Sequence, residues 1–206
     1  MATLHQVIQQ RAAALLGVVH SHNAGRENKC GILLSQFVEG AVDEVYLACN
    51  WPFGIHTNTQ SQLAALDANR IDDNHVEVFT EPYARLIAIA PSSTNWSLTN
   101  GNLSFKISRA LTGHQDPMVQ DKLTDLCPTN EIPDLIVGYK MHCNAKENNH
   151  HFVNLAAQCL AAQISYSLYS DSVYSDAARK QYLAALKDAQ TLYDYQLNID
   201  NASKVI

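Results

Sequence analysis

The chain has 206 residues, of which 47% are hydrophobic and 17% are charged, a composition that excludes an intrinsically disordered protein. The formal net charge is −6 and no cluster of lysine or arginine offsets it, so duplex nucleic acid is not an expected partner, because its binding depends on neutralising phosphates. No run of about 18 apolar residues occurs, and therefore neither a membrane-spanning helix nor a membrane partner is expected.

The cysteines favour reduced thiols in a cytoplasmic protein. The five cysteines lie far apart, are odd in number and form no C-x-x-C motif: Cys30, Cys49, Cys127, Cys143 and Cys159. An apolar run over residues 12–19 follows Arg11, but its helical spacing predicts an amphipathic helix kept in the mature protein and not a signal sequence.

In chain order, the first expected element is that helix, over residues 3–19. Two apolar stretches follow, Cys30–Val38 and Glu44–Asn50, and the short glycine-containing connection between them predicts a β-hairpin. Pro52 ends the second strand, because proline cannot donate a hydrogen bond to a ladder. Residues 60–69 are expected to form a short helix.

The middle of the chain gives weaker patterns. Thr80 and Pro82 together form a plausible helix start, so residues 83–90 are either a short helix or a buried strand. The Ser-, Thr- and Asn-rich segment Pro91–Gly101 is expected to be a loop, and the alternation over Leu103–Ile107 predicts a strand.

The last part of the chain is predicted to be mostly helical. Its expected elements are a short helix at Met118–Leu126, a strand at Asp134–Met141, and amphipathic helices at Phe152–Leu168 and Asp176–Gln196. This order predicts an α/β fold with one mixed sheet, an N-terminal helix, a β-hairpin and a helical C-terminus. We expect a single core domain over residues 1–170, with residues 171–206 as a helix packed on it.

The tripeptide His75-Val76-Glu77 is the most informative motif. An expected helix and hairpin precede it, and an expected strand leads to Cys143 further along. This arrangement resembles the zinc-dependent deaminases of the cytidine-deaminase-like superfamily, in which the His of H-x-E binds zinc and the Glu moves protons to and from the metal-bound water. The family's P-C-x-x-C motif is incomplete, because Lys146 stands where its second cysteine would be.

The resemblance implies a function and a set of site residues. It implies a metal-binding, deaminase-like hydrolase that acts on a base, a nucleotide or a related amide-bearing ligand. Glu77 would be the catalytic acid and base, His75 and Cys143 would be metal ligands, and zinc would be the cofactor. The substrate would be a small molecule or a protein.

Three alternatives stay open. A second metal constellation combines His142-Cys143 with His150-His151, although these histidines also fit a solvated helix start. A Cys–His thiol hydrolase or protein deamidase could use Cys30, which follows a polar segment with basic residues, or the local pair Cys49 and His56. The third alternative is a non-enzymatic binding or interaction protein. Cys159 is expected in the core.

Overall fold

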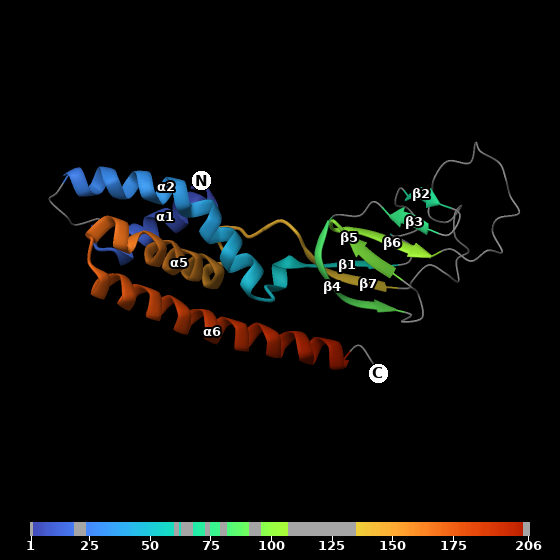
Figure 1. Cartoon of the computed structure of the whole chain (residues 1–206). Coiled ribbons are helices and arrows are strands. Elements are labelled where there is room, and N and C mark those ends of the chain that lie inside the picture. Colours follow the sequence, from blue (N-terminus) through green and yellow to red (C-terminus); the bar gives the residue numbers. More distant parts are fainter. Residues whose placement is uncertain are drawn as a thin grey trace, which may run out of the picture. The chain divides into compact units, whose positions relative to one another are not determined.

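The computed structural model describes residues 2–18, 24–59, 62, 68–72, 75–78, 82–90, 96–106 and 135–203 (Figure 1). Its contacts divide the chain into a helical unit, Met1–Pro52 with Cys143–Ile206, and a β unit, Phe53–His142. The expected combination of helices and strands, with a helix first and a helical C-terminus, is confirmed. Within the described residues, no helix is both long enough and apolar enough to span a bilayer.

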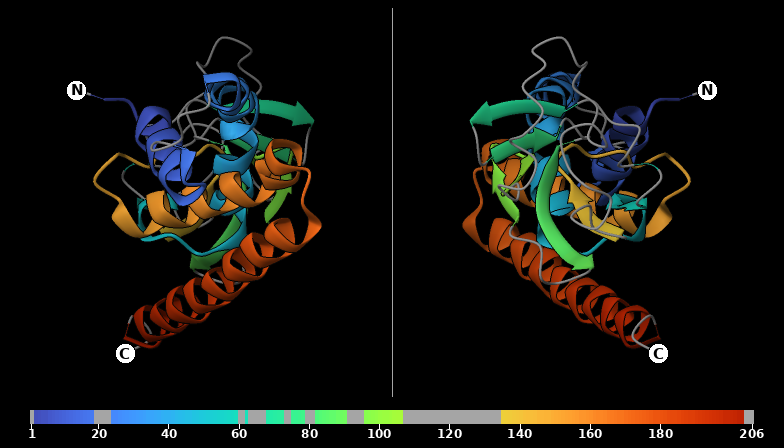
Figure 2. Two further views of the ribbon diagram at one scale, coloured as in Figure 1. Left: turned by 90° about the vertical axis from the view of Figure 1, so that its left-hand side faces the viewer. Right: turned by 90° about the vertical axis from the view of Figure 1, so that its right-hand side faces the viewer.

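The helical unit is built around one central helix. Its helices are α1 (Leu4–Leu15), α2 (Ala24–Ala48), α5 (His150–Tyr169) and α6 (Ser172–Ser203). α5 contacts the other three, and both views of Figure 2 show it between α1 and α6. Residues on most sides of α5 are buried, including Phe152, Leu155 and Leu160, because α1, α2 and α6 pack against it. The predicted boundary after residue 170 falls in the turn between α5 and α6, and the domain division itself stays a prediction.

The β-hairpin predicted over residues 30–50 is wrong, because α2 runs through this whole segment. The buried residues of α2 recur at steps of three and four along the chain: Cys30, Leu34, Val38, Ala41, Val42, Val45 and Tyr46. That spacing places them on one face of a helix. The connection that suggested a turn supplies Ala41 and Val42 to this face, and Gly40 is an exposed helical residue, a tolerated but slightly costly position.

Three antiparallel strands form the first sheet of the β unit, in the order β1 (Ile55–Thr59), β7 (Leu135–Lys140), β4 (Tyr83–Ala90). The strand predicted over Asp134–Met141 is confirmed as β7, and residues 83–90 take the strand alternative and not the helix that Thr80 was expected to start. β7 is the central strand and is buried along most of its length, which makes it the core of this unit.

The second sheet has the order β2 (Ala68–Asp72), β3 (His75–Val78), β6 (Asn102–Lys106), β5 (Trp96–Thr99). All ladders between described strands are antiparallel, where a mixed sheet was expected. Short connections such as the one between β5 and β6 join antiparallel neighbours, whereas a parallel pair needs a long crossover.

Two local predictions on this sheet need correction. The loop predicted over Pro91–Gly101 contains β5, which pairs with β6 through a turn at Asn100 and Gly101, with φ of 52° and 84°. Asn-Gly is the preferred sequence for such a hairpin turn. Two positions of the helix predicted over residues 60–69, Ala68 and Asn69, belong instead to strand β2. Most of its other positions lie outside the described residues. The helix predicted over Met118–Leu126 lies entirely outside the described residues, and so does Cys127.

Candidate functional site

His75 and Glu77, the predicted metal ligand and catalytic residue, belong to strand β3. Their backbone positions pair with Lys106 and Ser104 on β6, and with Asp72 and Asn69 on β2. The tripeptide therefore sits in an inner strand of a sheet. In the superfamily that it resembles, the corresponding residues begin a helix, so the local setting of the motif differs from the expected one.

Cys143, the other predicted ligand, follows β7 and belongs to the helical unit, whereas His75 and Glu77 belong to the β unit. The thiol is half-buried, and burial raises its pKa; a hydrogen bond with the backbone at Ala145 opposes this effect in part, and the Asp43 carboxylate adds a smaller upward effect. Zinc binds the thiolate form, so a raised pKa opposes this role. Among the described residues, no group of three or more His, Cys, Asp or Glu could hold a metal ion. The three predicted residues are thus divided between the two units, and the zinc site stays a prediction.

Cys30, the candidate nucleophile, is a buried residue of α2 with 2% of its surface exposed. Burial raises the pKa of its thiol. The two basic residues expected to activate it are engaged with α5, since Arg26 lies over the ring of Tyr169 and Lys29 donates a hydrogen bond to the carbonyl of Ser167. These contacts oppose a reactive thiolate, which requires a lowered pKa and access to solvent.

The remaining described thiols have the same character. Burial, with the Asp194 carboxylate as a further cause, raises the pKa of Cys49 to about 11. Cys159 is in the core, as predicted, and burial raises its pKa to about 12. Cys30, Cys49, Cys143 and Cys159 are all free cysteines. Cys49 belongs to the helical unit and His56 to the β unit, and their pairing stays a prediction.

His150 and His151 begin α5, which matches the expected helix start. The Nδ1 atom of His151 and the hydroxyl of Tyr193 are hydrogen-bonded at 2.9 Å. Trp51 packs against this pair, with ring centroids 6.2 Å from His151 and 4.7 Å from Tyr193, and donates its Nε1–H to the carbonyl of Val45 at 2.9 Å. This cluster joins the end of α2 and the C-terminal half of α6 to the start of α5, and it was not predicted from the sequence.

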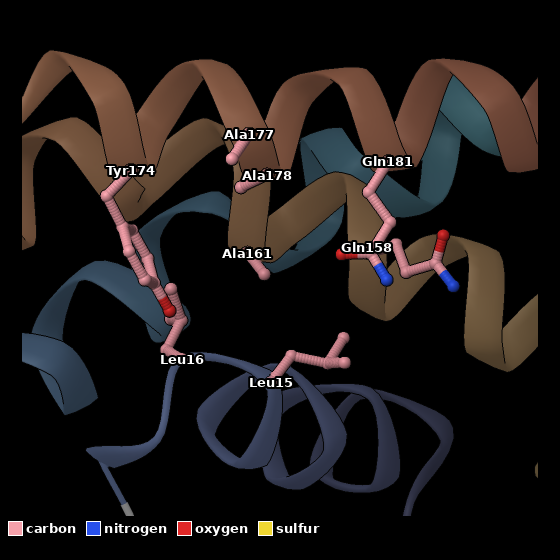
Figure 3. Close-up of a pocket in the computed structure, with 8 residues that line it drawn as sticks. All are labelled: Leu15, Leu16, Gln158, Ala161, Tyr174, Ala177, Ala178 and Gln181. Atoms are coloured by element: carbon pink, nitrogen blue, oxygen red, sulfur yellow. The ribbon is translucent and has the colours of Figure 1, made fainter.

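The helical unit contains an open cleft where α1 ends against α5 and the first turns of α6 (Figure 3). Its volume is about 150 Å³. Most of its lining is apolar, and comprises Leu15, Leu16, Ala161, Ala177 and Ala178. A second opening, lined by Arg11, Ala14 and Asn154 among others, shares Leu15 and Gln158 with the first. The small side chains of α5 and α6 do not fill this space, and no sequence motif predicted it.

The aromatic side of the cleft is held in place by neighbouring contacts. Tyr174 lines the cleft, and its ring packs against that of Tyr169 with centroids 4.6 Å apart. Tyr169 is fixed in turn, since its hydroxyl donates to the carbonyl of Leu16 and Arg26 lies over its ring. This chain of contacts links α1, α2, α5 and α6, so the wall of the cleft is formed before any ligand arrives.

The other side of the cleft is polar. Gln158 and Gln181 line it; in Figure 3 the amide of Gln181 reaches toward the space, whereas that of Gln158 points away from Tyr174. The Oε1 atom of Gln158 is buried and has no hydrogen-bond partner among the described residues. A buried acceptor without a partner is unusual in a folded protein and calls for an explanation, such as a bound water or ligand.

No protein-family model matches the chain, and no match is found among curated proteins.

Proposed function

We propose that the chain is a non-enzymatic binding protein that holds its ligand in the cleft between α1, α5 and α6. The observation that carries this proposal is the open, largely apolar space of about 150 Å³ in a unit whose central helix is otherwise tightly packed. Protein interiors are close-packed, and ligand sites are typically concave, mostly apolar and furnished with few polar groups. The cleft has these properties, with Tyr174 on one side and two amides on the other.

The state of the thiols supports binding over thiol catalysis. Each described cysteine has a raised pKa, and burial is the largest cause in every case. A Cys–His hydrolase or deamidase needs the opposite, a thiolate at neutral pH. The cytoplasmic location expected from the sequence belongs to the same proposal, since free thiols suit a reducing compartment.

A zinc-dependent, deaminase-like hydrolase is the second candidate, and the tripeptide His75-Val76-Glu77 is the observation that favours it. In this proposal His75 and Cys143 are metal ligands, Glu77 transfers protons, and the substrate is a base, a nucleotide or a related amide-bearing molecule. The strand setting of the tripeptide and the raised pKa of Cys143 weigh against it. We therefore place it second.

Titration of the full chain with toluene, a single apolar ring, tests the cleft directly. We expect saturable shifts in the amide resonances of Leu15, Ala161 and Ala178, because an apolar cavity of about 150 Å³ accepts one ring. Ala178→Leu places a larger side chain in the cleft and should abolish these shifts. Ala184→Leu makes the same change at an exposed position of the same helix and should leave them intact. Absence of saturable shifts in the wild-type chain would refute a binding site here.

A further inference from the structure

We infer that the second opening of the helical unit, between α1 and α5, binds the carboxylate of an aliphatic acid, with the guanidinium of Arg11 as its charge partner. This inference adds a site beside the cleft of the proposed function and does not depend on a ligand in that cleft. It follows from the shape of the opening, from the hydrogen bond between Arg11 and Asn154, and from the charges of the described residues that line it.

The second opening is a seam between two helix faces. Its lining comes from positions i, i+3 and i+4 of each helix, which lie on one face: Arg11, Ala14 and Leu15 on α1, and Asn154, Ala157 and Gln158 on α5. Arg11 and Asn154 contact each other at one end of the seam. Its volume is about 400 Å³, within the usual range of ligand sites. The seam thus has a polar end and, about one helical turn away, a more apolar end.

The polar end of the seam offers hydrogen-bond donors. Arg11 donates from Nη1 to Oδ1 of Asn154, and this fixes the orientation of the amide, because a guanidinium donates and cannot accept. The acceptor of Asn154 is therefore occupied, whereas its N–H groups and most of those of the guanidinium remain for a ligand. A ligand group that accepts from both side chains and donates to neither is an anionic oxygen group.

The charge of the lining favours a carboxylate among such anions. Arg11 is the only charged residue among the described residues that line the two openings. One guanidinium balances one negative charge, and its planar fork matches a carboxylate through two parallel hydrogen bonds. A phosphate monoester carries more than one negative charge at neutral pH and would keep part of it without a partner.

The rest of the seam suits an aliphatic chain. Ala14 is exposed, and Leu15 exposes 46% of its surface. An alkyl chain laid on these side chains removes apolar surface from water. None of the described residues that line this opening is aromatic, so the lining offers no ring for stacking. The apolar part of the ligand is therefore an alkyl chain that runs from the carboxylate towards Leu15.

Octanoate and 1-octanol form the matched pair of probes, because they share a chain length and differ in the carboxylate. Both are titrated into the full-length chain at pH 7, and the amide resonances of Ala14 and Ala157 follow binding. Arg11→Gln should weaken octanoate about threefold to tenfold, as expected for one charge pair at a half-buried guanidinium, and should leave 1-octanol unchanged. Lys187→Gln removes the same charge from an exposed position outside both linings, and should change neither affinity.

Asn154→Asp is a second variant that keeps the contact with Arg11. The new carboxylate would pair with the guanidinium in place of the ligand, so octanoate should again bind at least threefold more weakly, by about the loss expected for Arg11→Gln. Melting curves of all variants separate loss of binding from loss of folding. If Arg11→Gln does not fold, Asn154→Asp decides the test.

Each outcome has one meaning. Octanoate binding that weakens in Arg11→Gln and Asn154→Asp but not in Lys187→Gln supports the inference. An octanoate affinity that is the same in Arg11→Gln as in the wild-type chain overturns it, and so does an equal loss in Lys187→Gln, which would indicate a general effect of net charge. Absence of saturable shifts with octanoate in the wild-type chain also overturns it. The toluene titration decides the proposed function separately, since toluene carries no charge and its binding is followed in the first cleft.

Discussion

The ring of Tyr83, on β4, lies where a side chain at position 138 of the neighbouring strand β7 would be. A Cβ atom built on Gly138 would be 2.0 Å from Cδ1 of Tyr83, which no real contact allows. Across β7, the hydroxyl of Tyr83 accepts a hydrogen bond from Nδ2 of Asn58 on β1, at 2.5 Å in a buried position. The three strands of this sheet are therefore fastened by one side chain that crosses the central strand over a glycine.

Gly138→Ala should consequently destabilise the protein. The added methyl group must displace the Tyr83 ring and weaken its bond to Asn58, and overpacking of this kind costs about 1–3 kcal/mol. Urea unfolding of the full chain measures the change. Gly40→Ala is the control, because Gly40 is an exposed residue of α2 with nothing within 4 Å of an added Cβ. It should stabilise the chain by roughly 0.5–1 kcal/mol. Equal effects of the two substitutions would contradict the crossing-ring arrangement.

The buried thiols predict a loss of stability at alkaline pH. Their folded pKa values are raised from 9.0 to about 11 for Cys49 and to about 12 for Cys159. Above pH 9.0 the unfolded chain loses these protons while the folded chain keeps them, so the free energy of unfolding falls as the pH rises towards the folded values. Unfolding in urea at pH 8 and pH 10 measures the slope. The double variant Cys49→Ala with Cys159→Ala should show a shallower slope, and an unchanged slope would show that these thiols do not control it.

Thiol labelling should follow exposure. Cys143 is half-buried, whereas Cys30, Cys49 and Cys159 are buried. An alkylating reagent at neutral pH should therefore modify Cys143 before these three buried thiols. All four pKa values are raised, so the access of the reagent to the sulfur controls the rate of alkylation. Peptide mass spectrometry at successive times resolves the sites. Rapid labelling of Cys30 would restore the thiol hydrolase as a candidate.

The zinc hypothesis predicts a specific metal content. If His75 and Cys143 are ligands, the purified chain should hold about one zinc ion, since a catalytic site uses one metal ion with three protein ligands. His75→Ala should lose the metal, whereas Glu77→Gln should keep it, because Glu77 would not be a ligand. Elemental analysis of dialysed protein checks both variants. The deaminase-like hydrolase loses support if the wild-type chain holds negligible zinc, or if His75→Ala does not change the zinc content.

Removal of α6 should strongly destabilise the helical unit. The helix buries Tyr182 and Ala189, and the hydroxyl of Tyr182 donates to Oε1 of Glu44 on α2 at 2.8 Å. Burial of one large side chain contributes about 1.5–3 kcal/mol, and several would be uncovered when the chain ends at Asp171. Calorimetry should show a lower melting temperature or aggregation for the shortened chain. An unchanged melting temperature would mean that α6 is not part of the folded unit. Tyr182→Phe, expected to cost about 1 kcal/mol, isolates the hydrogen bond.

Sequence patterns predicted elements well where burial is one-sided or complete. The first helix and the helices α5 and α6 have clear periodicity, β7 is a short apolar run, and all four were found. α2 was missed because its apolar residues were grouped as two runs around Gly40, although their spacing continues through Ala41 and Val42. β5 was missed because polar residues dominate its segment, although Asn100-Gly101 marks a hairpin turn.

The candidate cleft lay beyond prediction for a different reason. Alanines such as Ala161 and Ala178 show up in a sequence as ordinary helix formers, and their effect arises only when three helices meet around them. The burial of Gln158 Oε1 without a hydrogen-bond partner among the described residues likewise depends on packing, since nothing in the sequence distinguishes Gln158 from any other glutamine. His75, Glu77 and Cys143 could be singled out by residue type, but their mutual placement depends on the fold.

The helical unit is assembled from two stretches of chain separated by the whole β unit, and this has a consequence for folding. α1 and α2 are synthesised before α5, the helix that packs against both, and α5 follows only after Phe53–His142 has been made. Closing so long a loop costs entropy and slows the pairing of distant helices. In that interval the apolar face of α2 is uncovered, which makes the nascent α1–α2 segment prone to bind chaperones. The β unit is contiguous and has all of its own residues available at that stage.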